Sequence, residues 1–284
     1  MMRLFGSLLL LGWWIGACAA QGDTLSRIRE SGEIRLGYIA QAAPFSFGGE
    51  DGGDPQGYST DLCRRIASGV RERLGLQKLR TTWVALTVQN RLAAVRDGKV
   101  DIECTTTTWT LSRQREVDFS LVVFVDGASV LTRRDPQFAT LADMKGKRIA
   151  VLTGTTTQLR LREALHKHRI DAEIVPVTAR DEGMKLLASR DVDGLASDRV
   201  VLIGLVQKSG PNPAYKVLDE DFSLEPYAFA IARGDPDFRL AVNEVLAAVF
   251  RSGEINAFYE RWLGQLGRPS LLLSAAFYLQ GLAE

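Results

Sequence analysis

The sequence predicts an α/β fold, because apolar strand-like runs alternate with amphipathic helix patterns along most of the chain. Residues 34–38 form the first apolar run, and from Tyr58 to Leu74 apolar side chains recur at every fourth position, which indicates a helix. The same order of strand and helix starts again at Lys147. Repeated β-α-β order implies parallel sheets with helices on both faces, in which ligands bind beyond the carboxyl ends of the strands.

The individual elements fall into two series. In the first we expect strands at residues 34–38, 79–84 and 100–104, with helices at residues 58–74 and 89–97. In the second we expect strands at residues 147–152, 173–176 and 193–196, a helix that ends near Lys167, and helices at residues 182–189 and 199–207, the last capped by Asp198. Two more helices are expected near the C-terminus, at residues 237–250 and 253–263.

The N-terminus predicts export from the cytoplasm. Arg3 precedes an apolar block from Leu4 to Ala20 that ends in small residues, the pattern of a secretory signal peptide over residues 1–20. Residues 15–18 also resemble a lipobox, in which Cys18 would carry a lipid; ordinary cleavage is favoured because a lipobox usually begins with Leu. The mature chain is expected in the periplasm. The later apolar cluster at residues 271–282 is too short to span a membrane.

The composition of the chain argues against nucleic-acid binding and against a metal or cofactor site. The chain has 35 basic and 34 acidic side chains, a balance that argues against a nucleic-acid partner. Beyond the signal peptide, Cys63 and Cys104 either join in a disulfide, as an oxidising periplasm allows, or stay as two buried free thiols. His166 and His168 point about 200° apart on a helix, so no shared metal is expected. No cofactor is expected either.

Four consecutive threonines, Thr105–Thr108, follow the expected strand at residues 100–104, and Arg113 comes shortly after them. A row of hydroxyls and backbone N–H groups beside one guanidinium suits a small carboxylate. Arg can grip two oxygens at once while the hydroxyls fill the remaining lone pairs. The alternative is a threonine-rich loop with a surface arginine.

The run Gly154-Thr155-Thr156-Thr157 also lies at the carboxyl end of an expected strand. A glycine permits a tight turn, and the start of the next helix presents unpaired N–H groups and a positive dipole end, which together form an anion site. The alternative is a plain N-cap by one of the threonines. Asp198 is likewise either a helix cap or the partner of a ligand ammonium group.

Eight motifs follow one another in a specific order and spacing. They are Ala43-Pro-Phe-Ser-Phe47, Gly57-Tyr-Ser-Thr-Asp-Leu62, Val88-Gln-Asn-Arg91, Gly98-Lys-Val-Asp101, Glu103-Cys-Thr-Thr-Thr107, Val117-Asp-Phe-Ser120, Gly154-Thr-Thr156, and Ser252-Gly-Glu254 with Trp262. Together they make residues 33–263 resemble the family-3 periplasmic solute-binding proteins of bacterial amino-acid ABC importers. The glutamate/aspartate-binding branch is the most similar.

This resemblance implies a type II periplasmic-binding-protein fold, with two α/β lobes that close on a ligand about two hinge strands. We place the crossings near Leu131-Thr132 and near Glu225-Pro-Tyr227. Lobe 1 is then discontinuous, with residues 33–131 and 227–265, and lobe 2 covers residues 132–226. Residues 266–284 are expected to form a C-terminal tail.

The resemblance also implies which residues hold the α-carboxylate of an amino acid. Arg113 matches the arginine that binds it, and Thr106 and Thr108 match small hydroxyl or backbone positions beside that arginine. Thr156, next to Thr155, matches a threonine of the second lobe that joins the same carboxylate after closure.

The remaining ligand positions concern the ammonium group and the side chain. Asp198 matches the carboxylate that receives the α-ammonium, and Arg91 matches an arginine that the acidic-amino-acid branch uses for the side-chain carboxylate. Arg180 stands where that branch has a histidine, whereas Ile39 replaces an arginine and Val88 a serine. An acidic ligand is favoured, because two cations outnumber the one that is lost. The alternative for Arg91 and Arg180 is solvated helix charge.

Three functions follow from these features. The first is a transport receptor that binds an amino acid, acts as a monomer and delivers its ligand to an ABC permease in the inner membrane. The second is a dehydratase-like enzyme on the same fold, which would need a general acid or base in the cleft. The third is a ligand-sensing module. The transport receptor is favoured, because no side chain stands out as a general acid or base.

Overall fold

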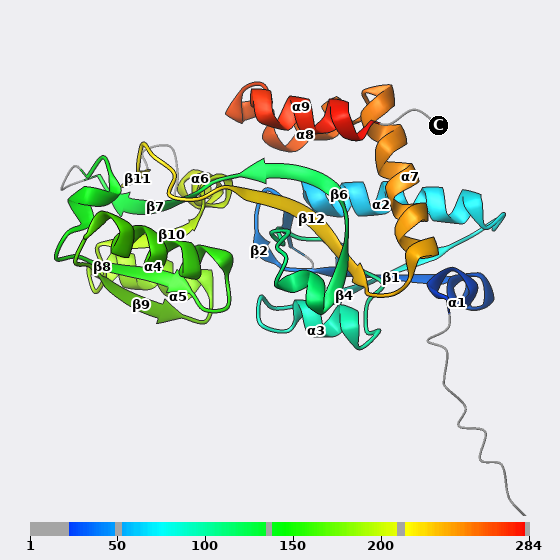
Figure 1. Cartoon of the computed structure of the whole chain (residues 1–284), viewed down its shortest axis with the longest axis horizontal. Coiled ribbons are helices and arrows are strands. Elements are labelled where there is room, and N and C mark those ends of the chain that lie inside the picture. The colour runs from blue at the N-terminus through cyan, green and yellow to red at the C-terminus, as the bar shows by residue number, and fades with distance from the viewer. Residues whose placement is uncertain (1–22, 49–52, 135–137, 209–213, 282–284) are drawn as a thin grey trace, which may run out of the picture.

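The computed structural model describes residues 23–48, 53–134, 138–208 and 214–281. These residues form two α/β lobes side by side, joined by the long strands β6 (Val117–Asp126) and β12 (Glu225–Ala232) (Figure 1). The predicted fold class is confirmed. The predicted signal peptide and Cys18 lie outside the described residues.

Lobe 1 is built on a five-stranded sheet in the order β4-β1-β5-β12-β6. Its other strands are β1 (Glu33–Tyr38), β4 (Arg80–Ala85) and β5 (Ile102–Glu103), with a small hairpin of β2 (Gln41–Ala42) and β3 (Ser46–Phe47). The helices of this lobe are α1 (Thr24–Ser31), α2 (Tyr58–Arg73), α3 (Arg91–Arg96), α7 (Pro236–Ser252), α8 (Ile255–Leu263) and α9 (Leu271–Gln280), with 3₁₀ turns η1 (Arg113–Arg115) and η3 (Gly264–Leu266).

Lobe 2 is built on a second five-stranded sheet in the order β11-β7-β10-β8-β9. The strands are β7 (Ala128–Arg133), β8 (Arg148–Leu152), β9 (Glu173–Val177), β10 (Gly194–Asp198) and β11 (Tyr215–Val217). The helices are α4 (Thr156–His168), α5 (Arg180–Ser189) and α6 (Arg199–Lys208), with the 3₁₀ turn η2 (Leu141–Met144).

Both sheets are mixed, although the sequence predicted parallel sheets. The β-α-β units do pair in parallel, as in β1 with β4 and β8 with β9. The strands next to the crossings run the other way: β12 is antiparallel to β5 and β6, and β7 is antiparallel to β10 and β11. The difference arises because hinge strands enter each sheet without a helical crossover, which only parallel neighbours require.

The first crossing lies earlier than predicted. Leu131 and Thr132 pair with Leu195 and Gly194 inside the sheet of lobe 2, so lobe 2 begins at Ala128 and the chain crosses at Gly127. Asp126-Gly127 interrupts the apolar pattern between β6 and β7, so the sequence does carry a signal for this boundary. A glycine fits the crossing because a Cβ at Gly127 would lie 2.4 Å from Asp221 Oδ2.

Lobe 1 also includes more of the chain than predicted. The residues assigned to a C-terminal tail contain α9, whose Leu273 and Phe277 are buried, and the Phe277 ring stacks on Phe250 at 5.0 Å. At the other end, α1 buries Leu25 and Ile28 against the same core. Within the described ranges, no helix has the length and apolar character needed to cross a membrane.

Candidate functional site

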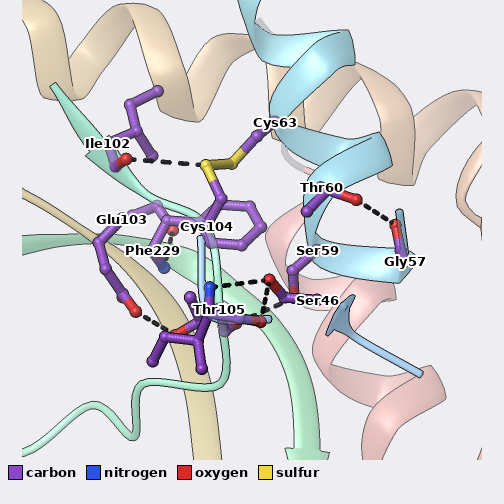
Figure 2. Close-up of a disulfide and its surroundings, with 12 residues drawn as sticks. Ser46, Gly57, Ser59, Thr60, Cys63, Ile102, Glu103, Cys104, Thr105 and Phe229 are labelled. Atoms are coloured by element: carbon purple, nitrogen blue, oxygen red, sulfur yellow. Dashed lines mark hydrogen bonds between the residues drawn. A yellow bond between two sulfur atoms is a disulfide. The ribbon is translucent and has the colours of Figure 1, made fainter. Parts of the chain in front are cut away.

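The threonine run is fixed to lobe 1 by a disulfide. Cys63 on α2 and Cys104 after β5 are bonded, with their Cα atoms 6.2 Å apart, so the disulfide alternative holds (Figure 2). The Ser59 hydroxyl, also on α2, donates to the backbone oxygen of Thr105 at 2.9 Å. Since the run starts directly after Cys104, both contacts hold it against α2.

The threonine run also pairs with the hinge strand β12. The Ala228 N–H donates to the Thr107 carbonyl at 3.1 Å, and the Trp109 N–H donates to the Pro226 carbonyl at 2.7 Å. Thr108 therefore lies opposite Tyr227 in an antiparallel bridge. The threonine run is an ordered part of the cleft wall, rather than the solvated loop that the sequence also allowed.

Thr108, Thr156, Ser223 and Glu225 form a group that we name the hinge cluster. The hydroxyls of Thr108 and Thr156 both donate to Glu225 Oε2, at 2.7 and 2.8 Å, and their oxygens lie 3.1 Å apart. The Ser223 hydroxyl donates to the other carboxylate oxygen, Oε1, at 2.7 Å. Sequence analysis expected Thr108 and Thr156 to hold a ligand carboxylate, but in this structure their hydroxyls hold Glu225.

The start of α4 combines both interpretations of the Gly154–Thr157 run. Thr155 is a plain N-cap: its hydroxyl oxygen accepts from the Gln158 N–H at 3.1 Å and donates to the Leu152 carbonyl at 2.7 Å. Thr156 is the first helical residue and faces an anion, the Glu225 carboxylate. The predicted anion site at this helix start is therefore occupied by a side chain of the same molecule.

Three arginines approach one another in the cleft, and we name Arg91, Arg113 and Arg180 the arginine cluster. Arg91 and Arg180 are 5% and 6% exposed, so neither is a solvated surface charge. Each of the three gives one Nη1 hydrogen bond to a backbone carbonyl: Val88 at 2.9 Å, Thr108 at 2.7 Å and Gln41 at 3.3 Å, respectively. The Nε atoms of Arg91 and Arg180 are buried and have no hydrogen-bond partner among the described residues.

Burial lowers the pKa values of these arginines, and nearby carboxylates act in the opposite direction. Burial lowers the pKa of Arg91 to about 10 and also lowers the pKa values of Arg113 and Arg180. Glu103 acts against this shift on Arg91 and Arg113, and Asp198 does so on all three. The three guanidinium groups and two carboxylates therefore share one electrostatic environment.

Glu103 is a buried carboxylate that the sequence analysis did not assign to the site. It is fully buried, accepts a hydrogen bond from the Thr105 hydroxyl, and has no partner for Oε2 in the described part of the chain. Burial raises its pKa, whereas Arg91 lowers it. The sequence analysis named Glu103 only as the first residue of a motif and gave it no role.

Asp198 lies at the end of β10, one residue before α6, and faces the cleft. It accepts from the Thr157 hydroxyl at 3.2 Å, and burial followed by repulsion from Glu225 raises its pKa to about 6. It was expected to cap α6, but the Val200 N–H donates instead to Asp126 Oδ2 at 3.1 Å. The residue that caps α6 is therefore Asp126 of the hinge strand β6. It is distant from α6 in the sequence, so the residues next to the helix could not predict it.

Asp126 ends β6 directly before the crossing. Its Oδ2 also accepts from the Tyr227 hydroxyl of the second hinge strand at 3.2 Å. Burial, and then repulsion from Asp198, raises the pKa of Asp126 to about 8. Thus a carboxyl group with an unusual pKa joins the two hinge strands to the first turn of α6.

The apolar residues predicted for the far end line a hollow between the lobes. Ile39 and Val88 border it from lobe 1 and Arg180 from lobe 2, and its volume is about 530 Å³. Two glutamines bridge the lobes across this mouth: Gln41 Nε2 donates to Asp181 Oδ2 at 3.0 Å, and Gln89 Nε2 donates to the Thr153 carbonyl at 3.4 Å. The lobes are thus in direct contact beside the hollow.

The structure places nine of the ten predicted site residues by the contacts above, and the tenth, Thr106, is half-buried within the threonine run. Glu103, Asp126, Ser223 and Glu225 were missed. Among the residues that the structure describes, no three His, Cys, Asp or Glu side chains lie close enough together to bind a metal ion.

Comparison with known proteins gives one family. Residues 34–265 match the description "Bacterial extracellular solute-binding proteins, family 3". The L-glutamate/L-aspartate-binding protein of Pseudomonas aeruginosa is 31% identical over 242 residues, which cover 85% of this chain and 80% of that protein. The glutamate/aspartate import solute-binding protein of Salmonella typhimurium is 26% identical, over 92% of this chain and 88% of the relative.

A solved structure with a similar fold has a different ligand. An ancestral arginine-binding protein bound to glutamine shares 27% identity with a TM-score of 0.71, covering 82% of this chain and 98% of that one. The family match covers both lobes and the cleft between them. The chain belongs to the bacterial extracellular solute-binding proteins, family 3, and is a binding protein rather than an enzyme.

Proposed function

We propose that this chain is the amino-acid-binding component of an ABC importer, and that its ligand is an acidic amino acid, glutamate or aspartate. In this role it acts as a monomer, binds the ligand between its lobes and delivers it to a permease in the inner membrane. Family membership and the names of the two curated relatives support this function. The arginine-binding neighbour shows that the fold alone does not select the ligand.

The observation that carries the proposal is the arginine cluster. A buried guanidinium nitrogen without a partner is costly, because it has lost its water and gained nothing in exchange. Arg91 and Arg180 each have such a buried Nε, and Arg180 also lines the hollow between the lobes. A ligand carboxylate would supply charged acceptors to both, and a second carboxylate would meet Arg113. An amino acid with two carboxylates fits this set.

The proposed orientation follows from where the groups lie. The α-carboxylate meets the Arg113 guanidinium beside Thr106, Thr108 and Thr156, and the α-ammonium meets Asp198. The side-chain carboxylate lies between Arg91 and Arg180, against the apolar walls of Ile39 and Val88. Thr155 caps α4 and so fixes the position of Thr156.

Charge supports the same ligand class. Three guanidinium groups, those of Arg91, Arg113 and Arg180, share one electrostatic environment with the carboxylates of Glu103 and Asp198. Glutamine or asparagine would place an uncharged amide against Arg91 and Arg180, which loses the stronger charge-assisted hydrogen bonds. Acidic ligands should therefore bind more tightly than their amides.

The test is a thermal-shift screen of the purified mature chain against the proteinogenic amino acids, since a ligand that binds only the folded form raises its melting temperature. Calorimetric competition among glutamate, aspartate, glutamine and asparagine follows, repeated with Arg91→Ala. Arg96→Ala is the matched control, because Arg96 is exposed on the same helix and pairs with Asp97. The acids should win in the wild type and in Arg96→Ala, and lose their advantage in Arg91→Ala. If the amides bind as tightly as the acids, the acidic assignment is wrong.

A further inference from the structure

The hinge cluster joins three parts of the chain that are far apart in the sequence. Thr108 ends the threonine run of lobe 1, Thr156 starts α4 of lobe 2, and Glu225 begins the hinge strand β12. The Glu225 side chain is buried, with 1% of its surface exposed. A buried carboxylate is stable only when hydrogen bonds replace its water, and here three hydroxyls supply them.

The number of hydroxyl protons limits how many hydrogen bonds Thr108 and Thr156 can donate. A threonine hydroxyl has one proton and can donate one hydrogen bond. The oxygens of Thr108 and Thr156 are both within donating distance of Glu225 Oε2, at 2.7 and 2.8 Å. When both protons point at this anion, neither hydroxyl can donate to a ligand. Charge-assisted bonds of this kind are about twice as strong as neutral ones.

The cluster bridges the lobes through only one of its members. Thr108 and Glu225 are held in register by the backbone pairing of residues 107–109 with β12, so this half moves with lobe 1 and the hinge. Thr156 moves with lobe 2. It also brings the positive end of the α4 dipole to the Glu225 carboxylate, which adds to the attraction. Opening of the lobes would separate Thr156 from Glu225 and leave the rest intact.

We propose that Glu225 is a positioning residue that holds the cleft closed without any ligand, by acting as an internal carboxylate at the start of α4. The ligand-free chain then populates the closed form, and the bond from Thr156 persists when the ligand is bound. The hydrogen bond between Thr156 and Glu225 thus stabilises the closed form in the absence of a ligand. This inference concerns the ligand-free chain and does not depend on which amino acid binds.

The experiment is small-angle X-ray scattering of the mature chain after unfolding and refolding, which removes any ligand carried through purification. Thr156→Val removes the bridging hydroxyl at constant volume, and Glu225→Ala removes the acceptor. Thr156→Ser restores a donor. Ser223→Ala is the matched control, because Ser223 donates to the same carboxylate from a neighbouring position in the chain.

The ligand-free wild type, Thr156→Ser and Ser223→Ala should share one small radius of gyration, and Thr156→Val and Glu225→Ala should share a larger one. If Glu225→Ala does not fold, as judged by circular dichroism, Thr156→Val alone carries the comparison. A wild type as expanded as Thr156→Val would overturn the proposal. So would a Ser223→Ala variant that opens as far as Thr156→Val, because the effect would then not come from the bridge between the lobes.

Discussion

The hinge cluster and the arginine cluster lie in the same cleft, but their polar groups are satisfied to different degrees. Glu225 in the hinge cluster accepts three hydroxyl hydrogen bonds from the chain itself. In the arginine cluster, Arg91 and Arg180 each keep a buried Nε without a partner in the described residues, and neighbouring Glu103 keeps a free Oε2. The polar groups of the hinge cluster therefore have hydrogen-bond partners within the chain, whereas some of those in the arginine cluster do not.

This difference changes how the binding site is recognised. Family resemblance points equally to Thr108, Thr156 and the arginines, because it transfers positions and not hydrogen bonds. The hydrogen bonds distinguish the threonines, which already have partners, from the arginines. A buried polar group that lacks a partner costs free energy until a ligand supplies one. We therefore expect most of the ligand-binding free energy to come from the arginine cluster, and most of the ligand-independent closure to come from the hinge cluster.

The largest expected effect is on Arg113, the member of the arginine cluster that donates to the Thr108 carbonyl of the hinge cluster. Arg113→Ala removes the guanidinium proposed to bind the α-carboxylate, and should weaken binding by about 2–5 kcal/mol, as for a buried charge pair that loses one partner. Arg115→Ala, an exposed arginine in the same 3₁₀ turn, is the control. Isothermal calorimetry with the best ligand of the screen measures both. Binding by Arg113→Ala within about threefold of the wild type would exclude this role.

The next effect concerns the disulfide, which fixes the threonine run and so the hinge cluster. Replacing Cys63 and Cys104 together by Ala should lower the free energy of unfolding by about 2–4 kcal/mol, because the cross-link restricts the unfolded chain. Urea unfolding measures this loss. An unchanged unfolding midpoint would show that the disulfide does not stabilise lobe 1.

A smaller effect is expected from pH. The folded pKa of Asp126 is about 8 and that of Asp198 about 6, both above the value of about 3.9 for an unfolded Asp. Between these values the folded chain binds more protons than the unfolded chain, so the free energy of unfolding falls as pH rises. The stability gained below the unfolded pKa is lost as pH passes the folded values.

The measurement is urea unfolding at about pH 6 and about pH 9. The wild type should lose stability across this interval, and Asp126→Asn should lose less because it cannot titrate. Asp237→Asn, at an exposed Asp in the first turn of α7, is the control and should follow the wild type. Equal slopes in the wild type and Asp126→Asn would contradict the raised pKa of Asp126.

Much of the fold could be predicted, because strands and helices leave local signals. The four-residue spacing from Tyr58 to Leu74 gave α2 to within one residue, and Lys147 to Leu152 gave β8. The crossing at Gly127 was placed too late, although Asp126-Gly127 interrupts the apolar pattern between β6 and β7. Helix α9 was taken for a tail because its burial depends on distant partners, Phe250 and β6.

The members of the binding site stay a prediction, whereas the hydrogen bonds among its side chains could not be predicted at all. Arg91, Arg180 and Asp198 interact electrostatically, because each lies in or next to a loop at the end of a strand. The hydrogen bonds between the threonine hydroxyls and Glu225 depend on strand β12. This strand enters lobe 1 from lobe 2 more than a hundred residues after Thr108. No local pattern in the sequence reports that contact, and so Glu225 was assigned only to the hinge.

The most direct test of the difference between the two clusters compares Arg91→Ala with Thr156→Val in calorimetric titrations with glutamate. Arg91→Ala should weaken binding by more than about 30-fold, or roughly 2 kcal/mol, because it removes a buried cation that the ligand completes. Thr156→Val should weaken binding by less than about tenfold, through a smaller population of the closed form alone. Arg96→Ala should bind as the wild type does. If Thr156→Val costs more than Arg91→Ala, the threonines and not the arginines carry the ligand, and the account is contradicted.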